Sequence, residues 1–127
     1  MIVNTLTKKN CWETYYELLT VSQYFRTVDK HGEKKFPEKE MKYFEYIVPT
    51  FNRYNIPKTF TLLPVIESCF DPQAVSHAKA VGMWQINRIT ARHLDMKIQR
   101  TKGGWIEDER YNWKRSTKAA AEYILFL

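Results

Sequence analysis

Apolar residues recur at helical spacing along most of this chain, while residues that interrupt helices are few. Only four glycines and five prolines occur among the 127 residues. A β-sandwich needs turn residues about every 8–12 positions, and this composition does not supply them. The helical spacing is clearest in residues 11–28, in residues 38–54 and in the segment that follows Asn112, a good N-cap. The sequence therefore predicts an all-α fold.

Shorter elements are expected between these segments. Pro57 suits the first turn of a third helix, where its missing N–H costs nothing. Residues 71–83 lack periodicity and predict an ordered loop. Residues 86–96 predict a short helix, and residues 99–104 predict a turn. No internal repeat interrupts this order, so we expect one folded unit.

The chain is basic, with 20 Lys and Arg against 14 Asp and Glu and a formal charge of +6. Such a charge favours anionic partners. The cluster from Lys30 to Lys39 also contains glutamates, however, so it reads as a solvated loop, and we predict no nucleic-acid binding. No apolar run is long enough for a membrane span, and residues 1–10 carry no signal-peptide core.

The cysteines and histidines are dispersed. Cys11 and Cys69 lie far apart without metal-ligand spacing, and two free buried thiols are favoured over a disulfide. His31, His77 and His93 form no zinc pattern with them. The sequence therefore predicts no metal and no cofactor.

One carboxylate lies on an apolar stripe. Phe60, Leu63, Glu67 and Phe70 follow helical spacing and share one face. Apolar surroundings disfavour the charged form of a glutamate and raise its pKa, as general-acid chemistry requires. The alternative is that Glu67 merely ends the helix and points to solvent, and spacing leaves both interpretations open.

Longer motifs surround this glutamate. Residues 63–72 read LPVIESCFDP, and residues 76–85 read SHAKAVGMWQ. Farther on, DER at 108–110 precedes STKAAAEYI at 116–124. From about Met41 to the end, the order and spacing resemble the soluble lytic transglycosylase domain of the lysozyme-like superfamily, in particular its membrane-bound lytic murein transglycosylase D type.

The resemblance implies a lysozyme-like helical fold and cleavage of the β-1,4 bond between N-acetylmuramic acid and N-acetylglucosamine in peptidoglycan. In this family one glutamate protonates the glycosidic oxygen and then takes the proton of the muramic 6-hydroxyl, which attacks C1. The product is 1,6-anhydro-muramic acid, and one carboxylate suffices, unlike the pair used by most glycosidases. By motif position, the resemblance makes Glu67 the catalytic acid and base.

The same motif positions imply a substrate-binding set, which consists of Ser68, Ser76, Gly82, Met83, Trp84 and Gln85. Ser68 would support the carboxyl group, and Gln85 would hydrogen-bond the sugar. Gly82 would allow close approach of the backbone to the glycan, and Met83 and Trp84 would shape the groove. The alternatives are core packing for Met83 and Trp84, a structural amide for Gln85 and a turn cap for Ser76.

Two positions depart from the family pattern. Asp71 stands where the family usually has asparagine, and its place before Pro72 favours a turn function over a second catalytic carboxylate. Lys79 replaces a commonly seen glycine and adds charge near the expected groove.

The family's A-Y-N-A-G motif is not reached before Leu127, and residues 123–127 are strongly apolar. We therefore expect residues 1–36 to form an N-terminal helix and loop packed on a catalytic domain of residues 37–127 that lacks its C-terminal helices. We also expect self-association, or a partner, at the apolar C-terminal helix.

The leading hypothesis is a lytic transglycosylase that acts on peptidoglycan glycan strands in the bacterial envelope or periplasm, with any membrane anchor outside this chain. One alternative is a lysozyme-type glycoside hydrolase of the same fold. Another is a non-catalytic module that binds peptidoglycan or a protein.

Overall fold

The computed structural model describes residues 38–104 and 106–127. The predicted helix over 11–28 and the N-terminal unit of residues 1–36 lie outside the described residues.

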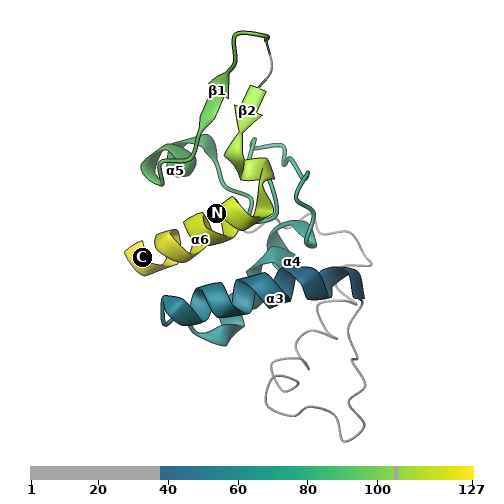
Figure 1. Cartoon of the computed structure of the whole chain (residues 1–127), viewed down its shortest axis with the longest axis vertical. Coiled ribbons are helices and arrows are strands. Elements are labelled where there is room, and N and C mark those ends of the chain that lie inside the picture. Colours follow the sequence, from purple (N-terminus) through teal and green to yellow (C-terminus); the bar gives the residue numbers. More distant parts are fainter. Residues whose placement is uncertain (1–37, 105) are drawn as a thin grey trace, which may run out of the picture.

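Two long helices form the centre of the fold. Helix α3 spans Glu38–Arg53, and helix α6 spans Trp113–Phe126. They pack against each other along their lengths (Figure 1). Both match their predicted ranges, and the Asn112 side chain accepts a hydrogen bond from the backbone N–H of Arg115, as expected of an N-cap.

The core lies between these helices and the segments that connect them. The apolar face of α3 meets a run of small residues on α6, and Trp84 fills the space beside them. Alanine has the smallest side chain of the helix formers, so α6 can approach its neighbours closely. The buried residues at the centre are Phe44, Ile47, Phe51, Val65, Met83, Trp84, Ile86, Ala119, Ala120 and Ala121.

The predicted third helix is divided in two. A 3-10 helix, η1, spans Lys58–Leu62, and helix α4 spans Leu63–Ser68 with Pro64 in its first turn. A 3-10 helix has three residues per turn, so its side chains are out of phase with those of the α-helix that follows. Phe60 is accordingly 37% exposed, and its expected place on the buried stripe is wrong.

Helix α4 ends in two residues of left-handed backbone. Cys69 and Phe70 have φ angles of 57° and 56°. The N–H of Phe70 donates to the carbonyl of Pro64 at 3.2 Å, and that of Cys69 donates to the carbonyl of Val65 at 3.0 Å. The bond from Cys69 to Val65 is that of an αL helix ending, which satisfies a terminal carbonyl of the helix, and the chain then turns Phe70 back into the core.

A long loop and a hairpin complete the fold. The loop after α4 is held by antiparallel bridges from Val81 to Val75 and to Ile86, in agreement with the ordered loop predicted here. Helix α5, Arg88–His93, follows, and strands β1, Ile98–Arg100, and β2, Ile106–Asp108, pair antiparallel. A short 3-10 helix, η2, spans Glu109–Tyr111 before α6.

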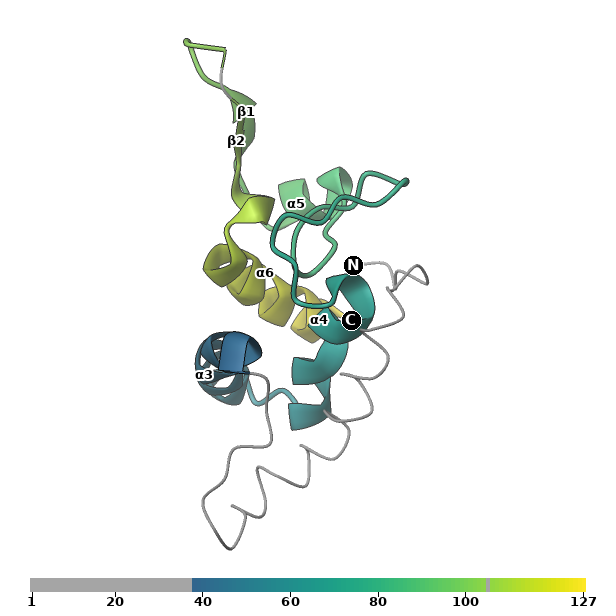
Figure 2. The ribbon, with the colours of Figure 1, turned by 90° about the vertical axis from the view of Figure 1, so that its right-hand side faces the viewer.

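The hairpin of β1 and β2 projects away from the helices (Figure 2). Only a turn was predicted at residues 99–104. Three-residue strands with mostly exposed side chains carry too little alternation to be recognised from sequence. The fold is otherwise helical, and the all-α prediction is confirmed. No helix among the described residues is long and apolar enough to cross a membrane.

Cys69 is disulfide-bonded, and no described cysteine is free. The expectation of two free thiols is therefore wrong for Cys69, while Cys11 lies outside the described residues. Sequence separation alone gave no sign of pairing, because long-range proximity depends on the fold.

The end of α6 exposes large apolar side chains. Leu125, Phe126 and Leu127 are 55%, 87% and 84% exposed. Exposed apolar surface favours association. We expect the double variant Phe126→Ser and Leu127→Ser to self-associate less than the unmodified chain, as measured by sedimentation velocity over a concentration series. Its free energy of unfolding should change by less than about 0.5 kcal/mol, because both side chains are already in water.

The matched control is Ile89→Ser, which removes a 70% exposed side chain from α5. It should leave the sedimentation profile unchanged. Identical profiles for the double variant and the unmodified chain would contradict a role of the α6 end in association.

Candidate active site

Glu67 lies in the last turn of α4 and is 1% exposed. The helix buries it beside Pro64 and Val65, and Phe70 returns to the core just after it. The solvent-facing alternative is therefore wrong. A carboxyl group removed from water in this way is suited to hold a proton near neutral pH and to give it to a bound substrate.

We expect the pKa of Glu67 to lie above the roughly 4.3 of a free glutamate, because burial disfavours its anion. Titration of the side-chain carboxyl carbon by NMR measures it directly. A value for Glu67 at or below that of free glutamate would contradict the expectation.

Ser68 joins α4 to the loop that follows it. Its hydroxyl group donates to the carbonyl of Met83 at 2.7 Å and accepts from the N–H of Asp71 at 3.2 Å. A serine hydroxyl carries one proton, and here that proton is directed at backbone. Ser68 therefore holds the loop against the helix that carries Glu67, rather than hydrogen-bonding its carboxyl group.

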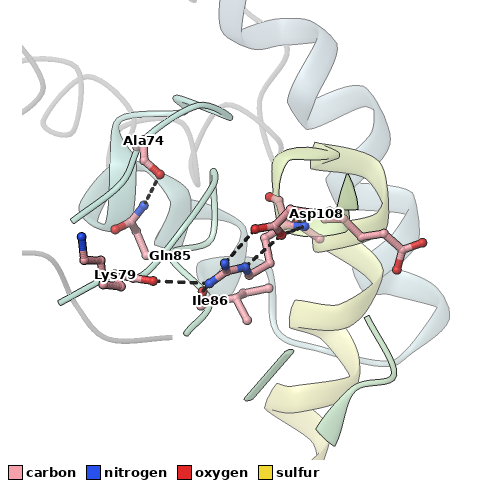
Figure 3. Close-up of polar contacts among 8 residues, drawn as sticks. Ala74, Lys79, Gln85, Ile86 and Asp108 are labelled. Carbon is pink, nitrogen blue, oxygen red and sulfur yellow. Dashed lines mark hydrogen bonds and ion pairs between the residues drawn. The ribbon is translucent and has the colours of Figure 1, made fainter. Parts of the chain in front are cut away.

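Gln85 is fully buried at the far end of the same loop. Its Nε2 donates to the carbonyl of Gly82 at 2.8 Å. It also donates to the carbonyl of Ala74 at 3.2 Å, as Figure 3 shows. These contacts fit the alternative of a structural amide. Its Oε1 is buried and has no hydrogen-bond partner among residues 38–104 and 106–127.

Met83 and Trp84 are fully buried in the core. The Trp84 ring lies 5.3 Å from that of Phe51, and its Nε1 donates to Thr117 Oγ1 at 3.0 Å. With its N–H satisfied inside the protein, Trp84 packs α3 against α6. The geometry favours the packing alternative for both residues over a place on a groove wall.

Ser76 and Asp71 both stabilise turns. Ser76 Oγ accepts from the N–H of Ala80 at 3.1 Å, in agreement with the turn-cap alternative. Asp71 Oδ1 accepts from the N–H of Gln73 at 2.9 Å, which is an Asx-turn. The turn function expected of Asp71 is confirmed.

Gly82 has a φ of 85°, and a Cβ atom there would collide with the backbone carbonyl of Arg110. The approach that this glycine permits is therefore to Arg110 and not to a glycan, which corrects the expectation. Ser116 Oγ holds the same carbonyl from α6 at 2.9 Å. The loop is thus pressed against η2 at Gly82.

Arg110 also holds this loop in place, and its role was not predicted from the sequence. It is almost fully buried, and its Nε and Nη2 bind Asp108 Oδ1 and Oδ2 at 3.0 and 2.7 Å. Its Nη1 donates to the carbonyls of Ile86 at 3.1 Å and Lys79 at 3.3 Å. One guanidinium group therefore fixes two separate points of the loop (Figure 3).

Only the DER motif at residues 108–110 marked this arginine in the sequence. Arginine is ordinarily exposed, so burial of Arg110 could not be read from its residue type. Together, Ser68, Gly82 and Arg110 fix the loop of residues 71–87 against α4 on one side and against η2 and α6 on the other.

The family model described as Transglycosylase SLT domain matches residues 46–127. Among curated proteins, "Membrane-bound lytic murein transglycosylase D" of Escherichia coli (strain K12) is 41% identical over 58 residues, which is 46% of this chain and 13% of that protein. A protein named for tributyltin chloride resistance in Alteromonas sp. (strain M-1) is 34% identical over 85 residues, 67% of this chain and 39% of that protein. The chain thus spans well under half the length of these relatives.

Proposed function

Because the chain belongs to the transglycosylase SLT domain family, we propose that it cleaves the glycan strands of peptidoglycan as a lytic transglycosylase. The bond cut is the β-1,4 linkage between N-acetylmuramic acid and N-acetylglucosamine. The observation that carries this proposal is the burial of Glu67 at the end of α4, within the ESCF segment.

Glu67 acts as acid and then as base. Its carboxyl proton passes to the glycosidic oxygen as the C1–oxygen bond breaks, which releases N-acetylglucosamine with a free hydroxyl group. The carboxylate then accepts the proton of the muramic 6-hydroxyl as that oxygen bonds to C1. The proton count balances, and no water enters the product.

The acidic residue nearest to Glu67 along the chain does not favour hydrolysis. Hydrolases of this kind generally place a second carboxylate where it can act as a nucleophile or activate water. Asp71, the nearest acidic residue along the chain, is exposed and uses its Oδ1 in a turn. Intramolecular attack by the 6-hydroxyl avoids the need for a second acid.

The loop of residues 71–87 supplies the remaining roles. Ser68 positions it through Met83, and Gly82 and Arg110 hold it from the other side. Within this scaffold, the fully buried amide group of Gln85 holds the loop together through the carbonyls of Gly82 and Ala74. Ser76 shapes the turn at the loop tip, and Met83 and Trp84 support it from the core.

A non-catalytic peptidoglycan-binding module is the second candidate. In that case substrate does not reach Glu67, which is 1% exposed, and no proton is transferred. Product analysis separates the two candidates.

We place this activity in the bacterial envelope, where its substrate lies. The disulfide at Cys69 supports an oxidising compartment such as the periplasm. Membrane anchoring through sequence outside this chain, and association through the exposed end of α6, complete the proposal.

The test is mass spectrometry of the products formed from purified glycan strands. Anhydro ends, which are lighter than reducing ends by one water, are expected. Reducing ends would show a hydrolase instead, and binding to the strands without any new ends would show the module.

A further inference from the structure

A cavity of about 380 Å³ opens beside the loop of residues 71–87. It is lined by Val75, Lys79, Val81, Arg88 and Arg110. Three of these side chains are cationic and none is acidic. The other two are the valines that the Val75–Val81 bridge places side by side.

The charges lining this cavity are not balanced. Arg110 is neutralised by Asp108, since its Nη2 lies 2.7 Å from Oδ2, and its Nη1 is directed at two backbone carbonyls. Lys79 and Arg88 are exposed, and no ion pair in the described part of the chain includes either of them. The cavity therefore carries two positive charges available to a ligand.

The backbone under these charges is fixed. Lys79 has a φ of 65°, its N–H donates to the carbonyl of Ser76, and its own carbonyl accepts from Arg110 Nη1. A lysine in left-handed backbone is strained, whereas a glycine would not be. The turn therefore carries the charge of Lys79 at a conformational cost in stability. A cavity lined by cationic side chains and by valines suits a ligand that joins a carboxylate to a short alkyl group. The cations would bind the carboxylate and the valines would pack against the alkyl group.

We infer that this cavity binds a carboxylate of the peptide stems that peptidoglycan carries on its muramic acid residues. The sugars of the strand are neutral where the lactyl carboxyl is joined to the stem, so the free carboxylates of the substrate lie on the peptide. Because the ligand is part of that substrate, the inference rests on the proposed function. It adds recognition of the peptide to cleavage of the glycan.

The direct test is an NMR titration of the isotope-labelled full chain with a soluble stem peptide that carries free carboxylates. The same peptide with its carboxylates amidated is the matched ligand. We expect the free acid, and not the amide, to shift the backbone signals of Val75, Lys79, Val81 and Arg88.

The double variant Lys79→Gln and Arg88→Gln should bind the free acid at least about tenfold more weakly, since it removes two charge-assisted contacts. The charge-matched control is Lys118→Gln with Arg92→Gln, two exposed residues that do not line the cavity. The control should bind like the unmodified chain.

Equal binding of the amidated peptide, or no loss of affinity in the Lys79 and Arg88 variant, would overturn the inference. Inorganic phosphate that displaces the peptide at equal concentration would overturn the assignment to a carboxylate.

Cleavage assays separate this inference from the proposed function. The Lys79 and Arg88 variant should show a larger rise in KM on stem-bearing strands than on strands stripped of peptide by an amidase. Peptide binding without any strand cleavage would defeat the proposed function alone. Cleavage with no response at the cavity would defeat this inference alone.

Discussion

Replacing Glu67 by glutamine should lower the turnover of peptidoglycan cleavage by at least about 10²-fold, the scale of general acid–base catalysis. Glutamine keeps the size and shape of the side chain but has no proton to give to the glycosidic oxygen. Because Glu67 is buried at the end of α4, a change of shape would also disturb the core, and this substitution avoids that. The measurement is the rate of anhydro-end formation on purified strands.

The control is Asp71→Asn, which restores the residue usual in the family. It keeps a side-chain oxygen that can accept from the N–H of Gln73, so the turn should persist and turnover should stay within a few-fold of the unmodified chain. Near-normal cleavage by a folded Glu67→Gln variant would refute the assignment. Loss of turnover in the Asp71 variant instead would move the chemistry to that residue.

The same pair of variants bears on the binding-module candidate. If the chain only binds peptidoglycan, Glu67→Gln should leave retention on insoluble cell walls unchanged, and neither chain should produce new ends. Retention without turnover in the unmodified chain would favour the module.

The long helices could be predicted because their signals are local. In α3 the apolar positions follow one period over four turns, and α6 begins at Asn112, whose side chain caps it. The irregular loop after α4 was also expected, since Asp71 and Pro72 define a turn by their own chemistry. The helical spacing identified Glu67 as a candidate, and the family motif around it predicted its role as catalytic acid and base.

Other features depend on contacts between distant residues. Gly82 reads as a turn glycine, but its partner is a carbonyl 28 positions later in the chain. Trp84 packs in the core and does not line a groove, because its N–H donates to Thr117 on the distant helix α6. The change from 3-10 to α-helical geometry between η1 and α4 moves Phe60 off the buried stripe. Residue types alone do not predict such a change.

Substitution of Gly82 by alanine should destabilise the fold by about 3–5 kcal/mol, a large part of the 5–15 kcal/mol margin of a small domain. Two effects contribute. A residue other than glycine at a φ of 85° costs about 1–2 kcal/mol. The added Cβ must also displace the carbonyl of Arg110, which Ser116 Oγ holds at 2.9 Å, so relief of the overlap breaks the contacts that fix the loop.

Gly104→Ala is the matched control for this variant. Gly104 has a φ of 81°, close to that of Gly82, but no atom of a non-neighbouring described residue lies within 4 Å of the place its Cβ would take. The free energy of unfolding of this variant should fall only by the conformational cost of about 1–2 kcal/mol. The difference between the free energies of unfolding of the two variants, measured by urea denaturation, therefore isolates the overlap with Arg110. Equal losses would show that the loop yields at Gly82, and that its fixed position beside Glu67 does not depend on Arg110.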